Sequence, residues 1–261
     1  PILLLSIVFF GLISFTGHQG GNITHGADYL VEPLPNSIKS VLGYEESDPS
    51  VTDRMQCGYP RFFRHPLINE LFASAAHTLC GENEAVAVFP HAHAASRATD
   101  FLKKRGCLQT KVLPFHGLFA LILPADYFKI AMEYWRYTGV IVSSCQAEYC
   151  LKNHAVQTCD PTPLLQQLSS SFNCEEEDLF LYENGMSAAF SAFRAAHSLQ
   201  PDKKTLQLEF PYVDVLKVQQ NFGHGVEYLN FAEGAEFDVM LLRIEEGEFS
   251  AIFCELPSNP L

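Results

Sequence analysis

The chain has 261 residues, of which 48% are hydrophobic and 18% are charged. This is the balance of an ordinary globular protein, and the length predicts one large domain or two modest ones. The formal net charge is −13 at pH 7, and no run of lysines and arginines interrupts the acidic surplus. We therefore expect neither nucleic acid nor a membrane surface as a partner, because both need clustered positive charge.

The first fifteen residues, PILLLSIVFFGLISF, are almost wholly apolar. They lack the basic region and the small-residue cleavage site of a signal peptide, and they are shorter than the roughly 18–20 residues that span a bilayer. A buried segment, the stub of a membrane anchor and sequence foreign to the mature protein are the open interpretations, and we favour the last. Residues 16–60 are rich in Gly, Pro, Ser and Asp, so we expect residues 1–57 to be an apolar start followed by extended coil.

Regular elements begin after residue 58. A proline followed by apolar residues every four positions predicts a helix over residues 66–79. The other elements expected in this part are a strand at 84–90, a helix at 94–105, a strand at 118–123 and a helix at 125–137. Alternating short strands and helices are typical of an α/β layer structure, so we expect an N-terminal α/β unit over residues 58–151.

Residues 152–177 break this alternation with Pro, Asn, Ser and an acidic run at 175–178 that we expect to be solvated. We interpret them as a seam between two units. Beyond the seam the alternation resumes with a strand at 178–182, a helix at 186–199, a strand at 205–210, a helix at 212–222, a strand at 226–231 and a strand at 249–255. The fold class predicted for the whole chain is α/β.

The eight cysteines have irregular spacing and form no C-x-x-C pair. This spacing is typical of free thiols in a reducing compartment, so we expect a cytoplasmic protein. We expect no metal site. Zinc ligands usually pair two to four residues apart, and His91 and His93 occupy i and i+2 positions of a predicted helix, which point apart. Cys254 has no basic neighbour to lower its thiol pKa, and we interpret it as a core residue.

The segment LYENGMSAA at residues 181–189 ends a predicted strand, turns at Gly185 and begins a long helix with small residues. The N-terminus of such a helix exposes unpaired N–H groups and the positive end of the helix dipole, which suit a phosphate. Gly185 has no Cβ and would allow a close approach of its backbone. The pattern alone leaves a plain turn open as the alternative.

Three segments in a fixed order carry a resemblance to a known family. The segment at 181–189 resembles the phosphate turn of the pyridoxal-phosphate (PLP) enzymes of cysteine and methionine metabolism. The segment FPYVDVLK at 210–217 resembles the element whose tyrosine stacks on the cofactor ring, and ELPSNPL at 255–261 resembles the element whose asparagine lies beside that ring. Upstream, the short segments GYE, GYPRFF and VFP resemble the N-terminal region of the fungal-type cystathionine gamma-synthases.

The resemblance implies a PLP-dependent transferase-like fold (aspartate aminotransferase-like, fold type I), whose incomplete sheet follows the smaller α/β unit. It implies a PLP phosphate on Gly185 and Met186, with Tyr212 over the ring and Asn259 at its edge. From the residues alone, Tyr212 could instead be a core aromatic and Asn259 a turn residue. The implied reaction is gamma-replacement of an activated homoserine ester by cysteine, in methionine biosynthesis, and the implied complete protein is a homo-oligomer.

The chain also departs from the family. The family's Schiff-base lysine lies downstream of the Asn-Pro-Leu turn, beyond Leu261, so we assign no catalytic residue and interpret residues 178–261 as the truncated first part of the PLP-binding domain. The Thr110-Lys111 pair lies in the wrong unit. The seam has no Tyr-x-Arg pair, and Asn184 replaces the usual serine. The alternatives are a truncated non-catalytic relative and a sister enzyme, either a gamma-lyase or a homoserine sulfhydrylase.

Overall fold

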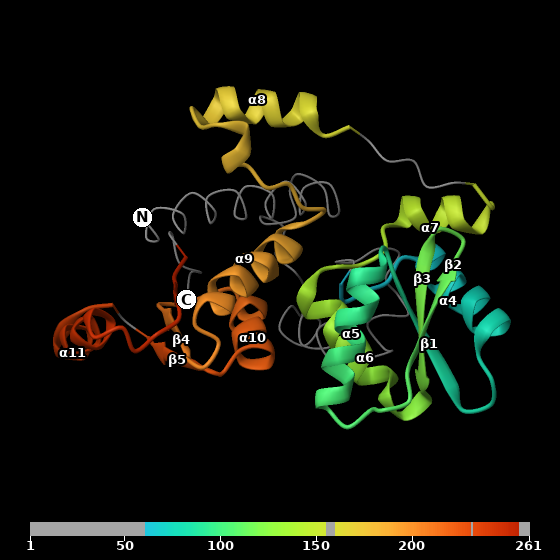
Figure 1. Cartoon of the computed structure of the whole chain (residues 1–261), viewed down its shortest axis with the longest axis horizontal. Helices are drawn as coiled ribbons and strands as arrows, with labels where there is room; N and C mark the ends of the chain where they lie inside the picture. The colour runs from blue at the N-terminus through green and yellow to red at the C-terminus, as the bar shows by residue number, and fades with distance from the viewer. Residues whose placement is uncertain (1–60, 155–159, 231, 256–261) are drawn as a thin grey trace, which may run out of the picture. The chain divides into compact units, whose positions relative to one another are not determined.

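The structure is a computed structural model that describes residues 61–154, 160–230 and 232–255 (Figure 1). The described residues form two compact units. The N-terminal unit comprises residues 61–136 and 140–183, and the C-terminal unit comprises residues 137–139 and 184–255. Each unit combines helices with a small sheet, which confirms the predicted α/β class.

The N-terminal unit is built on an antiparallel sheet. Its elements are α4 (Pro66–Leu79), β1 (Glu84–Phe89), α5 (Ala92–Lys104), β2 (Lys111–Phe115), β3 (Leu118–Pro124), the 3-10 turn η1 (Ala125–Tyr127), α6 (Phe128–Thr138), α7 (Ser144–Leu151), α8 (Thr162–Phe172) and the 3-10 turn η2 (Glu176–Asp178). Strands β1 and β2 both pair antiparallel with β3, which gives the order β1-β3-β2. The β2–β3 hairpin turns on His116 and Gly117, both with positive φ, as a two-residue turn requires.

Aromatic residues of α6 hold the core of this unit together. Trp135 is 1% exposed, and its Nε1 donates a hydrogen bond to the Val88 carbonyl of β1 at 3.2 Å. The edge of its ring meets Phe72 of α4, with the ring centres 6.3 Å apart. Tyr134 lies against Phe101 of α5 at 5.5 Å, so that α5 and α6 pack side by side (Figure 1).

The C-terminal unit is built on a parallel sheet. Its elements are α9 (Gly185–Leu199), β4 (Thr205–Leu208), α10 (Val213–Phe222), β5 (Val226–Leu229), α11 (Gly234–Glu245) and β6 (Ile252–Phe253). Both β5 and β6 pair parallel with β4, which gives the order β5-β4-β6. A helix connects each successive pair of strands, because parallel strands need a long crossover.

Helices cover both faces of this sheet. On one face, Phe253 of β6 packs with residues of α9 and α10 in a cluster that includes Phe193 and Val215. On the other face, Leu206 of β4 and Leu229 of β5 pack against Met240 of α11. The alternation of side chains along each strand separates the two clusters.

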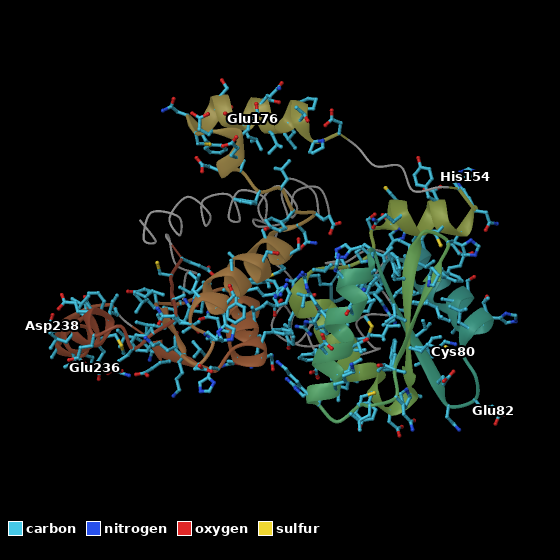
Figure 2. The ribbon with its side chains drawn as sticks, in the orientation of Figure 1. Cys80, Glu82, His154, Glu176, Glu236 and Asp238 are labelled. Carbon is cyan, nitrogen blue, oxygen red and sulfur yellow. The ribbon has the colours of Figure 1, made fainter. Side chains whose placement is uncertain are left out.

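Most of the predicted elements are confirmed. The helices predicted at 66–79, 94–105 and 125–137 appear as α4, α5 and α6, and those at 186–199 and 212–222 appear as α9 and α10. The strands predicted at 84–90, 118–123, 205–210, 226–231 and 249–255 appear as β1, β3, β4, β5 and β6, the last three of them shorter. The acidic surplus is solvated in both units, and the exposed side chains of Glu82, Glu176, Glu236 and Asp238 are examples (Figure 2).

The strand predicted over residues 178–182 is wrong. Asp178 ends the turn η2, and the residues after it pair with no strand in the described chain. Phe180 and Tyr182 are 69% and 42% exposed, so this apolar run lies beside no sheet that it could join. An apolar run becomes a strand only where a neighbour accepts its hydrogen bonds.

Several predictions fall on residues that the structure does not describe. The apolar start and coil of residues 1–57 lie outside the described residues, as does Asn259. In the described ranges, no helix combines the length and the apolarity needed to cross a bilayer.

Candidate functional site

The predicted phosphate turn lies at the start of α9. Asn184 caps this helix: its Oδ1 accepts the Ser187 N–H at 2.9 Å, and the Ser187 Oγ accepts the Asn184 N–H at 3.3 Å. This capping box occupies the third N–H of the helix. Within the described residues, the N–H groups of Gly185 and Met186 have no hydrogen-bond acceptor. Two leading donors are therefore left for a ligand.

A glycine holds the cap in place from another part of the C-terminal unit. The Asn184 Nδ2 donates to the Gly139 carbonyl at 2.7 Å. Gly139 has φ of 66°, and a Cβ there would lie 2.7 Å from the Ser187 nitrogen and 2.6 Å from the Asn184 Oδ1. Only glycine fits this close approach. The asparagine that replaces the family's serine thus uses both ends of its amide, one for the cap and one for Gly139.

The second part of the site lies at the carboxyl ends of the strands. The chain passes from β4 to β5 on one side and then to β6 on the other, so the topology switches between β4 and β6. Ligands of α/β sheets bind outside the carboxyl ends of the strands at such a point. Tyr212 follows β4 and Glu255 follows β6, and the Glu255 Oε1 accepts the Tyr212 N–H at 2.6 Å.

Tyr212 also connects this edge with the start of α9. Its side chain is partly buried against the same core cluster that contains Met186. Its hydroxyl donates to the Oδ2 of Asp214 at 3.3 Å, and Asp214 is 1% exposed. The structure thus brings together Met186 and Tyr212, two of the predicted site residues.

Two glutamates to which the sequence assigned no role line the same edge. Burial raises the pKa of Glu255, although the hydrogen bond from the Tyr212 N–H opposes the shift. Glu209 directly follows β4, and its Oε1 accepts the Ala232 N–H at 2.8 Å. Both residues lie at the end of a strand predicted from the sequence, and that position was the available signal for them.

The cysteine and histidine side chains in the described ranges form no cluster that could hold a metal ion. The six cysteines in the described ranges are free thiols, as predicted. Cys254, interpreted as a core residue, is half-buried, and burial, followed by the charges of Glu255 and Glu209, raises its pKa. The His91 Nδ1 accepts the Ala94 N–H at 3.1 Å and caps α5, and burial lowers the pKa of this imidazole.

The lysines of the C-terminal unit lie elsewhere. Among its described residues, Lys203 and Lys204 precede β4 at the amino edge of the sheet, and Lys217 lies within α10. The family's Schiff-base amine is therefore not among the described residues at the carboxyl edge.

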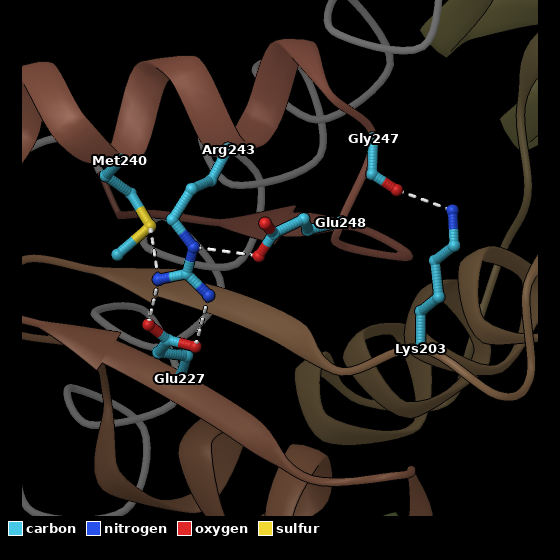
Figure 3. A network of polar contacts seen from close by, with 6 residues as sticks. All are labelled: Lys203, Glu227, Met240, Arg243, Gly247 and Glu248. Carbon is cyan, nitrogen blue, oxygen red and sulfur yellow. Dashed lines mark hydrogen bonds and ion pairs between the residues drawn. The ribbon is translucent and has the colours of Figure 1, made fainter.

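An open pocket of about 330 Å³ lies at the amino edge. Three cations and three acids line it, together with His224 and Phe249: Lys203, Lys204, Arg243, Asp202, Glu227 and Glu248. Because these charges balance and Arg243 binds both glutamates (Figure 3), we assign no ligand to this pocket.

Comparisons with known proteins agree with the motif order. A model of the N-terminal domain of fungal trans-sulfuration enzymes matches residues 67–143. The chain is 25% identical to a cystathionine gamma-synthase of Neurospora crassa, over 84% of this chain and 57% of that protein. It is 28% identical to a cystathionine gamma-synthase of Saccharomyces cerevisiae, over 61% of this chain and 27% of that protein.

A bacterial relative extends the comparison. The chain is 23% identical to an L-2-amino-4-chloropent-4-enoate dechlorinase/desaturase of Streptantibioticus cattleyicolor, over 90% of this chain and 50% of that protein. The chain thus spans little more than half, or less, of the length of these relatives. No solved structure gives a significant match. In the N-terminal domain match and in the two cystathionine gamma-synthases, the chain is thus similar to the fungal-type cystathionine gamma-synthases.

Proposed function

We propose that the chain is the N-terminal part of a PLP-dependent enzyme that forms cystathionine by gamma-replacement. The observation that carries the proposal is the pair of unpaired N–H groups of Gly185 and Met186 at the start of α9. Tyr212, which packs on the same cluster as Met186, adds an aromatic ring to that constellation. The parallel sheet with helices on both faces supports a PLP-dependent transferase-like fold of fold type I, which stays a prediction.

Each residue has a defined part in holding the cofactor. The Gly185 and Met186 N–H groups would donate to the PLP phosphate, which the positive end of the α9 dipole would also favour. Tyr212 would offer its face to the pyridine ring, and Asn259 would lie at the edge of that ring. When bound, PLP supplies the electron sink for carbanion chemistry on an amino-acid substrate.

The expected substrates share a leaving group on the γ carbon. An activated homoserine ester carries its acyloxy group there, and cysteine would replace it. The name of the S. cattleyicolor relative places a chlorine on carbon 4 of a 2-amino acid, which is also the γ carbon. The name describes removal of that chlorine with desaturation, so it supports a leaving group on the γ carbon and does not bear on its replacement by cysteine. A homo-oligomer is the expected complete form.

The test uses pyridoxine 5′-phosphate, which has the phosphate and ring of PLP and cannot form an imine. Gly185 is the first residue of α9, a position where proline is well tolerated, so Gly185→Pro removes one N–H donor and keeps the helix. We expect saturable binding to the native chain by calorimetry. Loss of one hydrogen bond to an anion should weaken it by about 10–100-fold.

Ser144→Pro is the matched control, because it places proline at the first residue of α7, outside the site. It should leave the affinity unchanged. If the native chain does not bind the probe, or if Gly185→Pro binds as tightly as the native chain, the cofactor assignment is wrong.

A binding-only role is the second candidate. The observation that favours it is the position of the described lysines of the C-terminal unit, which lie at the amino edge or within α10. Borohydride reduction of the chain with PLP, followed by peptide mapping, separates the two roles. A specifically labelled lysine supports a catalytic role of this chain. Reversible PLP binding without a labelled lysine supports the binding-only role.

A further inference from the structure

Two glutamates connect the loops at the carboxyl edge of the parallel sheet. Glu255 lies just after β6. Its Oε1 accepts the N–H of Tyr212 in the loop after β4. Glu209 follows β4, and its Oε1 accepts the N–H of Ala232 in the loop after β5. Each glutamate therefore follows one strand and binds the loop that follows the neighbouring strand.

The sheet order makes these two bonds a continuous series. Because β6, β4 and β5 are adjacent and parallel, their carboxyl ends lie at one edge. One bond joins Glu255, after β6, to the loop that follows β4, and the other joins Glu209, after β4, to the loop that follows β5. They join residues 43 and 23 positions apart in the chain, so they fix the loops to each other independently of the strands' own hydrogen bonds.

The backbone at Glu209 indicates that this arrangement is specific. Glu209 has φ of 59°, in the left-handed region that residues with a side chain rarely adopt. Such a conformation persists only where the surroundings hold it. Here the Glu209 N–H donates to the Leu229 carbonyl at 2.9 Å, and the carboxylate holds the Ala232 N–H.

Glu255 affects the candidate site through its hydrogen bond with the backbone of Tyr212. Tyr212 is the residue that precedes α10, where its backbone N–H has no place in the helical ladder. The hydrogen bond that this N–H donates to Glu255 fixes the backbone from which the ring projects. Glu209 follows β4 and Glu255 follows β6, so the two carboxylates lie at the same edge of the parallel sheet.

We propose that Glu255 is a positioning residue, which sets the ring of Tyr212 for stacking on the cofactor without touching the cofactor itself. This proposal rests on the proposed function. The hydrogen bond from Tyr212 needs only an oxygen acceptor. Glu255→Gln therefore keeps the bond, whereas Glu255→Ala removes it.

Amide hydrogen exchange at Tyr212 tests the bond directly. We expect slow exchange in the native chain and in Glu255→Gln, and exchange faster by about tenfold or more in Glu255→Ala. Glu233→Ala is the matched control, since Glu233 is an exposed glutamate after β5 whose side chain makes no capping hydrogen bond. If Tyr212 exchanges equally fast in the native chain and in Glu255→Ala, the bond and the proposal are both overturned.

Binding of pyridoxine 5′-phosphate tests the effect on the ring. Stacking on Tyr212 should quench the fluorescence of the probe in the native chain and in Glu255→Gln. Glu255→Ala should lose the quenching and bind about tenfold more weakly. A native chain that does not bind the probe contradicts the proposed function, while the exchange experiment still decides whether Glu255 holds Tyr212.

The remaining outcomes are also decisive. If the native chain binds and the folded Glu255→Ala variant keeps full affinity and quenching, Glu255 does not position the ring. Should Glu255→Ala fail to fold, Glu255→Asp serves instead, because its carboxylate is one methylene shorter and withdraws from the Tyr212 N–H. Retained slow exchange and quenching in Glu255→Asp overturn the proposal in that case.

Discussion

Asn184 accepts a hydrogen bond from Ser187 and donates one to Gly139, so that both ends of its amide are engaged at the start of α9. A serine at this position could cap the helix, but its shorter side chain could not donate across to Gly139 in the same way. The departure from the family's serine therefore coincides with a local arrangement of its own, in which the side chain holds the turn.

Gly139→Ala should destabilise the C-terminal unit. A left-handed backbone costs alanine about 1–2 kcal/mol, and displacing the Ser187 backbone from the new Cβ should add about 1–3 kcal/mol. Gly117→Ala is the matched control, because Gly117 has φ of 84° but open space around it. Urea unfolding measures both variants, and equal losses would show that the Gly139 contact adds nothing.

The residues of the site differ in how far the sequence could reveal them. Gly185, Met186 and Tyr212 belong to segments whose local pattern resembles the family, so they could be named in advance. Glu255 and Gly139 act through contacts with residues 43 and 45 positions away. No local pattern encodes such distant pairs, because the folded topology alone brings them together.

At the scale of elements, Arg243 links α11, the helix that connects β5 with β6, to strand β5. It projects from α11 and binds Glu227 of β5 with two nitrogens, and its Nε binds Glu248 at 2.8 Å (Figure 3). The hydrogen bond from Arg243 lowers the pKa of Glu227 below its ordinary value of 4.5. The same contacts raise the pKa of Arg243. The helix and the strand are thus linked by a charge-assisted pair.

Glu227 and Glu255 should affect stability with opposite dependence on pH. The lowered pKa of Glu227 means that its contribution is present above pH 4.5 and is lost as the pH falls through the folded pKa. The raised pKa of Glu255 means that its contribution is present below pH 4.5 and is lost as the pH rises through the folded pKa.

Urea unfolding across this pH range checks both signs. Relative to the native chain, Glu227→Gln should match it in acid below the folded pKa of Glu227, lose stability as the pH rises from there to 4.5, and keep that deficit at higher pH. Glu255→Gln should gain relative stability as the pH rises. Parallel curves for the two variants would contradict the assigned shifts.

The elements that sequence patterns missed have identifiable reasons. Helix α7 begins with a capping box of Ser143 and Gln146, a signal that was present but brief. Helix α8 carries an apolar stripe of Leu164, Leu168 and Phe172, but Pro, Ser and acidic residues around it led to its interpretation as part of the seam. Helix α11 carries exposed apolar residues, Val239 and Leu242 among them, and these obscure its period. Strand β2 contains Pro114, which is typical of an edge strand and weakens the strand signal.

At the scale of the whole molecule, the two units have separate cores. Trp135, the single tryptophan of the chain, is buried in the N-terminal unit with Tyr134. Phe193 is 1% exposed in the C-terminal unit, where it stacks on His197 and contacts Phe253. We expect separate unfolding transitions, because Trp135 and Phe193 are buried in different compact units.

Phe193→Ala should therefore destabilise only the C-terminal unit, by about 3–5 kcal/mol. Tryptophan fluorescence reports the N-terminal unit alone, and its urea midpoint should stay unchanged. Far-ultraviolet circular dichroism reports both units and should show an earlier transition. Phe89→Ala, in the core of the N-terminal unit, should do the reverse. A shared shift in both signals would mean that the units unfold together.

The two glutamate bonds at the carboxyl edge have a consequence for how this fold can change. Loops on most sheets tolerate insertions one at a time, since each loop is anchored only by its own strands. Here an insertion after β5 would pull on Glu209, and one after β4 would pull on Glu255. Loop lengths at this edge are therefore coupled, and a designer who lengthens one loop must redesign its neighbour as well.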